Sequence, residues 1–264
     1  NLFRAIRRGN LAEVKRFLDE GGSIETVGGR FHGTLFLESC RYHTAKVAEL
    51  LLDRGANVNV SGGGFWTALH YASDGQEDAA LVATLIRRGA EVDAVDFHGR
   101  TALHIASRQG SPAVALALLE AGAEPNVVDD DKRTPMHYAA VTGKREVLAM
   151  LLGFGGDVSA RDRELETPLH GATRQGRGTA MSLLRRAGAD PTTVNCWGEQ
   201  AGTLAPNYKM NPVPRKDKEG DDVESGPCIA CSAKSGRHYY FCKSEILQDI
   251  PDTLILGSDG LPIG

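Results

Sequence analysis

Apolar residues along the chain fall into short stretches that share a helical spacing and end at a glycine. Between Thr101 and Gly110, and again between Ser111 and Gly122, apolar positions recur three and four residues apart, as on one side of a helix. A more polar stretch then runs to Arg133. Residues 101–133 are therefore predicted to form a helix, a turn, a second helix and an extended loop.

The same pattern returns at a fixed interval. Five threonines stand 33, 34, 33 and 33 residues apart, and four of them open the tetrapeptide Thr-(Ala/Pro)-(Leu/Met)-His. A period in this range is typical of a stacked repeat array. The tetrapeptides resemble those of ankyrin-repeat proteins, and the resemblance covers about residues 1–200. The threonines are Thr34, Thr67, Thr101, Thr134 and Thr167.

The resemblance implies an all-α fold, an ankyrin-repeat solenoid of about six helix-turn-helix units with β-hairpin-like loops and a mostly irregular C-terminal tail. The array is predicted to span residues 1–205. In the first unit we expect helices at Leu2–Arg8 and Leu11–Leu18. Residues 206–227, rich in proline and charge, are predicted to be a flexible linker, and residues 228–264 a small Cys/His-containing tail. The six units lie at about 1–33, 34–66, 67–100, 101–133, 134–166 and 167–199.

Four histidines recur in register within the array. A metal site needs converging ligands, and one imidazole per repeat does not bring ligands together. The resemblance implies instead that each histidine hydrogen-bonds to hairpin backbone, while the threonine before it caps the helix. Asp129-Asp-Asp131 lacks the rest of a calcium loop and is interpreted as solvated charge. The histidines are His70, His104, His137 and His170.

Charge and apolar content narrow the class of protein. The net charge of −4 is spread evenly, because residues 1–200 carry 23 basic and 25 acidic residues and residues 201–264 carry 7 and 9. No basic domain stands out, so nucleic-acid binding is not favoured. The apolar run Val114–Leu119 is far shorter than the roughly 20 residues that span a bilayer. Five cysteines, three of them after residue 227, do not resemble a disulfide framework. We expect a monomer in the cytoplasm, with the nucleus an open alternative.

Catalytic motifs do not appear in the sequence. A nucleophile elbow, a phosphate-binding loop, a metalloprotease helix motif and a dinucleotide fingerprint are all missing. We therefore expect no enzyme activity, no small-molecule substrate and no cofactor within the array.

The resemblance implies non-catalytic recognition of a protein through a concave groove, lined by the hairpin tips and the exposed sides of the first helices. The candidate residues are those that the repeat itself does not require. They mix aromatic and arginine side chains, the combination that binding hot spots favour. Packing of Trp66 or Phe97 against a neighbouring hairpin is the structural alternative. The partner-binding candidates are Phe65, Trp66, Tyr71, Phe97, His98, Arg100, Arg108, Asp131, Arg133 and Arg174.

The tail offers a second candidate. Cys228, Cys231, His238 and Cys242 form a set of three thiolates and one imidazole, which suits a tetrahedral structural zinc, and their spacing resembles that of a zinc knuckle with a longer central gap. Ordinary thiols in a disordered tail are the alternative. Two further functions stay open: an adaptor whose zinc-bound tail contacts a second protein or nucleic acid, and the targeting domain of a larger enzyme.

Overall fold

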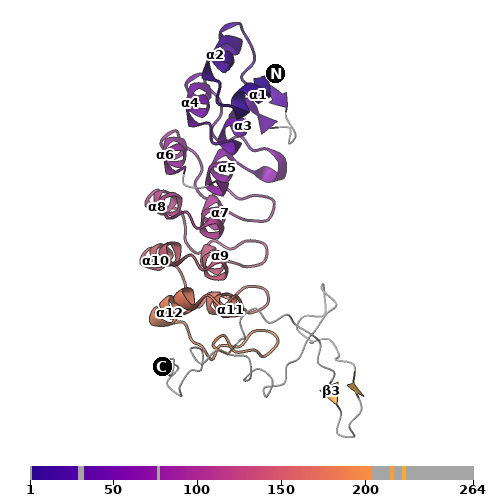
Figure 1. Cartoon of the computed structure of the whole chain (residues 1–264), viewed down its shortest axis with the longest axis vertical. Helices are drawn as coiled ribbons and strands as arrows, with labels where there is room; N and C mark the ends of the chain where they lie inside the picture. Colours follow the sequence, from indigo (N-terminus) through magenta and orange to yellow (C-terminus); the bar gives the residue numbers. More distant parts are fainter. Residues whose placement is uncertain (1, 29–32, 76–77, 204–214, 217–221, 224–264) are drawn as a thin grey trace. The chain divides into compact units, whose positions relative to one another are not determined.

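The structure is a computed structural model that describes residues 2–28, 33–75, 78–203, 215–216 and 222–223 (Figure 1). The chain divides into two compact units, Asn1–Asp157 and Val158–Gly264. Helices are the main regular elements among the described residues of both units, as the sequence predicts.

Two rows of short helices make up the first unit (Figure 1). The odd-numbered helices pack on one another in chain order, and each even-numbered helix packs against the helix before it. The first row holds α1 (Leu2–Arg7), α3 (Leu35–Arg41), α5 (Ala68–Asp74), α7 (Ala102–Gln109) and α9 (Pro135–Thr142). The second row holds α2 (Leu11–Asp19), α4 (Ala45–Asp53), α6 (Ala79–Arg87), α8 (Pro112–Glu120) and α10 (Arg145–Gly153). The two helices predicted within residues 1–33, Leu2–Arg8 and Leu11–Leu18, are thus confirmed, and the C-terminal end of each differs by one residue.

Loops project from the side of the first row (Figure 1). Near the N-terminus, β1 (Val27–Gly28) pairs antiparallel with β2 (Gly33–Thr34). The next loop carries the 3-10 turn η1 (Gly63–Phe65) and closes with a bridge between Ser61 and Thr67. These loops are the hairpin-like connections that the repeat pattern predicts.

In the first row, α5, α7 and α9 begin at a reciprocal cap. The Thr101 side chain accepts from backbone at the third helical position, and His104 Nδ1 in return accepts from Thr101 N at 3.1 Å. This arrangement satisfies two N–H groups that a helix start leaves unpaired. At the other end of each unit the chain turns through a left-handed residue such as Gly122, with φ of 91°, where a side chain would be strained.

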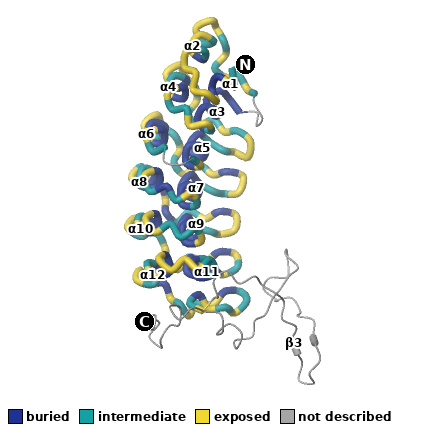
Figure 2. Tube along the Cα trace, in the orientation of Figure 1, coloured by how far each residue is buried: buried dark blue, intermediate teal, exposed yellow. Residues whose placement is uncertain are grey.

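Burial is concentrated in the first row and on the inward side of the second (Figure 2). In α8, Val114 and Leu118 are completely buried, and Leu103 of α7 is 1% exposed. Each fully buried side chain of this kind contributes about 1.5–3 kcal/mol of transfer free energy. The helical spacing of these residues, read from the sequence, therefore defines the core.

Ion pairs connect successive helices of the second row on the exposed side. Arg54 Nη2 lies 2.7 Å from Asp19 Oδ1, and Arg88 pairs with Asp53 in the same way one repeat later. Because these side chains are exposed, each pair contributes at most about 1 kcal/mol.

The second unit contains α11 (Pro168–Arg174) and α12 (Gly178–Arg186), which pack together. A hairpin follows, closed by a bridge between Val194 and Gln200, and Asn195 N donates to Glu199 O at 3.0 Å. Within the segment predicted to be linker, β3 (Arg215–Lys216) pairs antiparallel with β4 (Asp222–Val223).

No helix in the described ranges is both long enough and apolar enough to cross a bilayer.

Candidate partner-binding face

Four successive hairpin tips are each organised by one buried polar side chain. Asp96 Oδ1 accepts hydrogen bonds from His98 N at 2.9 Å and Arg100 N at 3.0 Å. The equivalent residues of the following repeats accept in the same way from the second and fourth residues after them. The organising residues are Asp96, Asp129, Asp162 and Asn195, at intervals of 33 residues. This series was not among the sequence predictions, although its regular spacing is visible along the chain.

Asp129 corrects one interpretation made from the sequence. It is only 6% exposed, so it is not solvated charge. Its carboxylate accepts from Arg133 N at 2.8 Å, Asp131 N at 2.9 Å and Tyr138 Oη at 2.6 Å. Burial, with this carboxylate next to it, raises the pKa of Tyr138. Closure of the hairpin draws the first aspartate of the run inward and leaves Asp130 and Asp131 at the surface.

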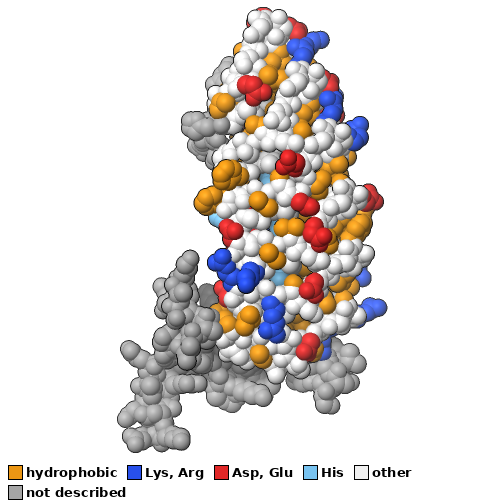
Figure 3. All heavy atoms as spheres, turned by 180° about the vertical axis from the view of Figure 1, so that it is seen from behind, with side chains coloured by type: hydrophobic (Ala, Val, Ile, Leu, Met, Phe, Trp, Pro, Cys, Tyr) orange, Lys and Arg blue, Asp and Glu red, His pale blue; other side chains and the backbone are white. Residues whose placement is uncertain are grey.

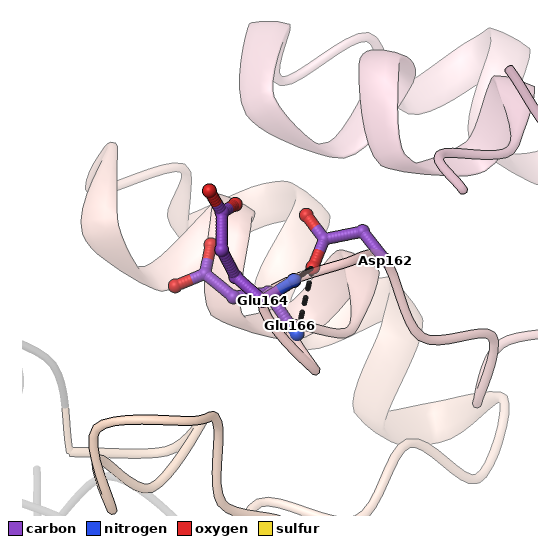
Figure 4. Close-up of side chains that lie close together, drawn as sticks. All are labelled: Asp162, Glu164 and Glu166. Atoms are coloured by element: carbon purple, nitrogen blue, oxygen red, sulfur yellow. Dashed lines mark hydrogen bonds between the residues drawn. The ribbon is translucent and has the colours of Figure 1, made fainter. Parts of the chain in front are cut away.

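Asp162 shows the same geometry in the second unit (Figure 4). Its Oδ1 accepts from the backbone N of Glu164 and of Glu166, each at 2.9 Å. Ligand atoms of these three acidic residues lie within 4.8 Å of one another. The group is therefore explained by hairpin closure, which brings alternate residues of the tip together.

A second repeated feature is a left-handed backbone residue just before the end of each tip. Phe65 has φ of 59°, Lys132 59° and Leu165 60°, while the equivalent Gly99 and Gly198 have 72° and 77°. A side chain at such a position costs roughly 1–2 kcal/mol of strain. Two repeats avoid that strain with glycine, whereas Phe65, Lys132 and Leu165 keep a side chain there, and of these three only Phe65 is aromatic.

Phe65 and Phe97 form an exposed pair on neighbouring tips. Their rings stack with centroids 6.5 Å apart at an interplanar angle of 17°. The two residues are 60% and 67% exposed, and Phe97 N donates to Gly64 O at 2.9 Å, which ties the two tips together. His98 meets the Phe97 ring edge-on, with centroids 5.6 Å apart. The structural alternative is thus correct in part: Phe97 packs on a neighbouring hairpin, yet most of its surface remains open.

Trp66 and Tyr71 extend the aromatic contacts toward the first-row helices. Their ring centroids are 5.1 Å apart, and the Trp66 ring also lies 6.0 Å from that of His70. Tyr71 is largely buried at 9% exposure, and the Arg41 guanidinium lies 5.6 Å from its ring centroid. Tyr71 therefore supports the surface more than it forms it. We name Phe65, Trp66, Phe97 and His98 the aromatic tip patch.

The arginines predicted to bind a partner differ from one another in their surroundings. Arg100 donates to Asp96 Oδ2 through Nε at 3.0 Å and Nη2 at 2.7 Å. Burial alone would raise the pKa of Asp96, but the hydrogen bonds from Arg100 outweigh it and hold that pKa below its usual value. Arg108 Nη2 lies 3.2 Å from Asp74 Oδ1, on a more exposed part of α7. Arg133 is half-buried and its carbonyl faces His104, whereas Asp131 is exposed at the same tip.

Arg174 belongs to the second unit, among carboxylates of its own. It pairs with Glu166 and, at 3.2 Å, with Glu199 Oε2, and its guanidinium lies 5.7 Å from the centroid of the Trp197 ring. Burial raises the pKa of Glu166, and Arg174 opposes that change. The aromatic candidates form two contacting sets in the first unit, and Arg174 has a separate environment. The sets are Phe65, Phe97 and His98, and Trp66 with Tyr71.

The histidine prediction is confirmed where the structure gives the contact. His104 Nε2 lies 3.0 Å from Arg133 O, His70 Nε2 2.8 Å from Arg100 O, and His170 Nε2 3.2 Å from Glu199 O. Burial lowers the pKa of His104 to about 4, despite its contact with the Arg133 carbonyl. These imidazoles are structural links between a helix and a hairpin.

The proposed zinc ligands Cys228, Cys231, His238 and Cys242 lie outside the described residues, so that site stays a prediction.

On the face shown in Figure 3, acidic and basic side chains are interspersed with small apolar groups.

A search of curated proteins finds no significant match to the chain. Comparison with protein-family models finds ankyrin repeats, in a model of three copies, at residues 35–129 and 117–195. Ankyrin repeats generally act as protein-interaction modules and are typically non-catalytic. These matches cover more than half of the sequence and coincide with the helix pairs described above, so the chain belongs to the ankyrin-repeat family.

Proposed function

We propose that this chain is a non-catalytic scaffold that binds a partner protein through the hairpin tips and first-row helices of residues 1–157, with the aromatic tip patch at the centre of the interface. We further propose that it acts as a monomer in the cytoplasm. The observation that carries the proposal is the stacked pair of Phe65 and Phe97, two aromatic side chains that remain exposed on neighbouring tips.

The strained backbone at Phe65 supports a role in binding, because the repeat does not need a side chain at this position. The equivalent positions at Gly99 and Gly198 hold no side chain, so a glycine would serve the hairpin. Lys132 and Leu165 carry side chains on the same left-handed backbone, so the strain supports function at Phe65 only together with the exposed aromatic ring placed there.

The exposed aromatic area supports the same surface. Phe and Trp side chains bury about 150–250 Å² each when covered, and interface energy concentrates in a few such anchors. Phe65 and Phe97 are already held against each other, so little side-chain freedom is lost when a partner covers them.

Site-specific photocrosslinking tests the proposal. A photoreactive phenylalanine analogue is placed at position 97 in the full chain and, as a matched control, at position 154, where Phe154 is 44% exposed at the end of α10. We expect a partner protein to be crosslinked from position 97 and not from position 154. Phe65→Ala with Phe97→Ala should abolish its recovery, and Phe154→Ala should not.

Equal crosslinking from both positions, or undiminished recovery by the Phe65→Ala/Phe97→Ala variant with an unchanged melting curve, would show that the patch is not the binding surface.

A further inference from the structure

Four arginines lie in or next to α1 and α3, which pack together at the N-terminal end of the first unit (Figure 1). Arg7 and Arg8 follow Arg4 by three and four positions, the spacing of residues on one side of a helix. Arg7 ends α1, and Arg8 directly after it still donates from its backbone N to Arg4 O at 3.2 Å. Arg41 occupies the last turn of α3. We name Arg4, Arg7, Arg8 and Arg41 the arginine cluster.

Two of these guanidiniums are held by aromatic rings of the next repeat. The Arg7 guanidinium lies 5.1 Å from the Tyr42 ring centroid, and that of Arg41 lies 5.6 Å from the Tyr71 ring centroid. Cation–π contacts of this kind restrict the arginine side chains without neutralising them. The two charges are therefore positioned in advance.

One buried carboxylate accompanies the cluster. Glu38 Oε2 lies 3.7 Å from Arg7 Nε, beyond hydrogen-bond distance, and the Glu38 side chain is 2% exposed while that of Arg7 is 39% exposed. Glu38 therefore contacts Arg7 from the buried side, and the solvent-facing side of the Arg7 guanidinium stays open.

Arg4 and Arg8 have no such partner. Both are exposed, and within the described residues neither side chain makes a hydrogen bond or an ion pair. Like charges four positions apart on a helix repel each other. An anion bound between them would relieve that repulsion.

The ends of α5 and α7, by contrast, pair their charges. One repeat further, Asp74 receives hydrogen bonds from Arg108 Nη2 at 3.2 Å and from Gln109 Nε2 at 2.7 Å. The first-row helix ends of α5 and α7 thus balance their own charges. An acidic ligand would be attracted to one end of the row.

Tyr71 connects this end to the aromatic tip patch. Its ring contacts Trp66 on one side and the Arg41 guanidinium on another. The two surfaces are therefore continuous through three side chains in contact.

We propose that the arginine cluster binds an acidic segment of the partner protein, so that the partner presents apolar anchors to the aromatic tip patch and carboxylates to Arg4, Arg7, Arg8 and Arg41. This inference rests on the proposed function and adds the chemistry of the partner. A nucleic acid fits the arginine cluster itself less well, because single-stranded recognition needs open aromatic faces among the basic residues, and there arginines already lie over Tyr42 and Tyr71.

Fluorescence anisotropy with the full chain tests the inference. The probes are labelled peptides that carry two phenylalanines followed by a run of glutamates, the same peptides with glutamine in place of glutamate, and a labelled oligouridylate. We expect the glutamate peptide to bind about tenfold or more tightly than the glutamine peptide at low salt, with the difference shrinking as salt screens the charges.

Arg4→Glu with Arg8→Glu should remove that preference. Lys15→Glu with Lys46→Glu is the matched control, since it makes the same change in net charge at exposed residues of α2 and α4, and it should keep the preference. Equal binding of the two peptides, no binding of either, or binding of the oligouridylate alone would overturn the inference.

The two proposals fail in different ways. If Phe65→Ala/Phe97→Ala abolishes crosslinked partner while Arg4→Glu/Arg8→Glu retains it, the aromatic interface stands and the acidic-segment inference is wrong. Loss of partner in neither variant would reject the proposed function itself.

Discussion

The imidazole Nε2 of His104 lies 3.0 Å from the carbonyl oxygen of Arg133, a residue 29 positions further along the chain. The same ring accepts from Thr101 N through Nδ1 at 3.1 Å. One buried side chain thus joins the start of a helix to the end of the following hairpin. Its position in the repeat is what makes the helix and the hairpin a single unit.

Substitution of His104 by Ala is expected to lower the free energy of unfolding by about 1–3 kcal/mol, because the Arg133 carbonyl and the Thr101 N–H lose a buried partner. Urea denaturation followed by circular dichroism measures the change. His98→Ala, at an exposed tip residue, should change the free energy by less than about 0.5 kcal/mol. An unchanged midpoint in the His104 variant, accompanied by loss of metal affinity, would contradict a structural role.

Acidification should destabilise the array through its buried histidines. The folded-state pKa of His104 is about 4, below its ordinary value of 6.5, and burial likewise lowers the pKa values of His70 and His170. The neutral ring is favoured in the folded state. The contribution of the neutral His104 ring to the free energy of unfolding is therefore complete above pH 6.5 and is lost as pH falls toward about 4.

For His104 the loss is on the order of 3 kcal/mol across that range. Denaturation curves collected at several pH values measure it, and His104→Gln should show a shallower dependence than the parent chain. The same slope in both proteins would mean that other groups cause the acid sensitivity.

Asp129→Ala is expected to cost at least about 2 kcal/mol, because two backbone N–H groups and the Tyr138 hydroxyl lose their acceptor. Asp130→Ala removes an exposed carboxylate from the same tip and should cost less than about 0.5 kcal/mol. Thermal or chemical melting of both variants compares them. Equal losses of unfolding free energy in the two variants would show that Asp129 behaves as a solvated charge.

Phe65→Asn separates stability from binding. Asparagine tolerates the left-handed backbone, so relief of roughly 1–2 kcal/mol of strain should offset the loss of about 0.5–1.5 kcal/mol of stacking on Phe97. We expect the free energy of unfolding to change by less than about 1 kcal/mol while partner recovery falls about tenfold or more.

Lys132→Asn is the control for that prediction, since Lys132 has the same φ of 59° on another tip. It should relieve strain and leave partner recovery unchanged. A large loss of stability in Phe65→Asn would instead show that the hairpin needs the phenylalanine.

The sequence by itself determined the helices and their caps. The spacing of Thr101, His104 and the apolar residues between Val114 and Leu119 is read directly along the chain, because helix caps and helix faces depend on residues three or four positions apart. The same period predicted how many units to expect and where each begins. The same 33-residue period also relates Asp96, Asp129, Asp162 and Asn195, so this series too can be predicted from the sequence.

Tertiary structure decided the surface. Phe65 meets Phe97 and Trp66 connects to Arg41 only because the repeats stack in a particular register, and no local spacing encodes distances between residues of different repeats. Burial of Asp129 has the same origin: three consecutive aspartates are alike in sequence, and hairpin closure turns one of them inward. Local periodicity fixes the elements, whereas contacts between elements fix which side chains remain exposed to meet a partner.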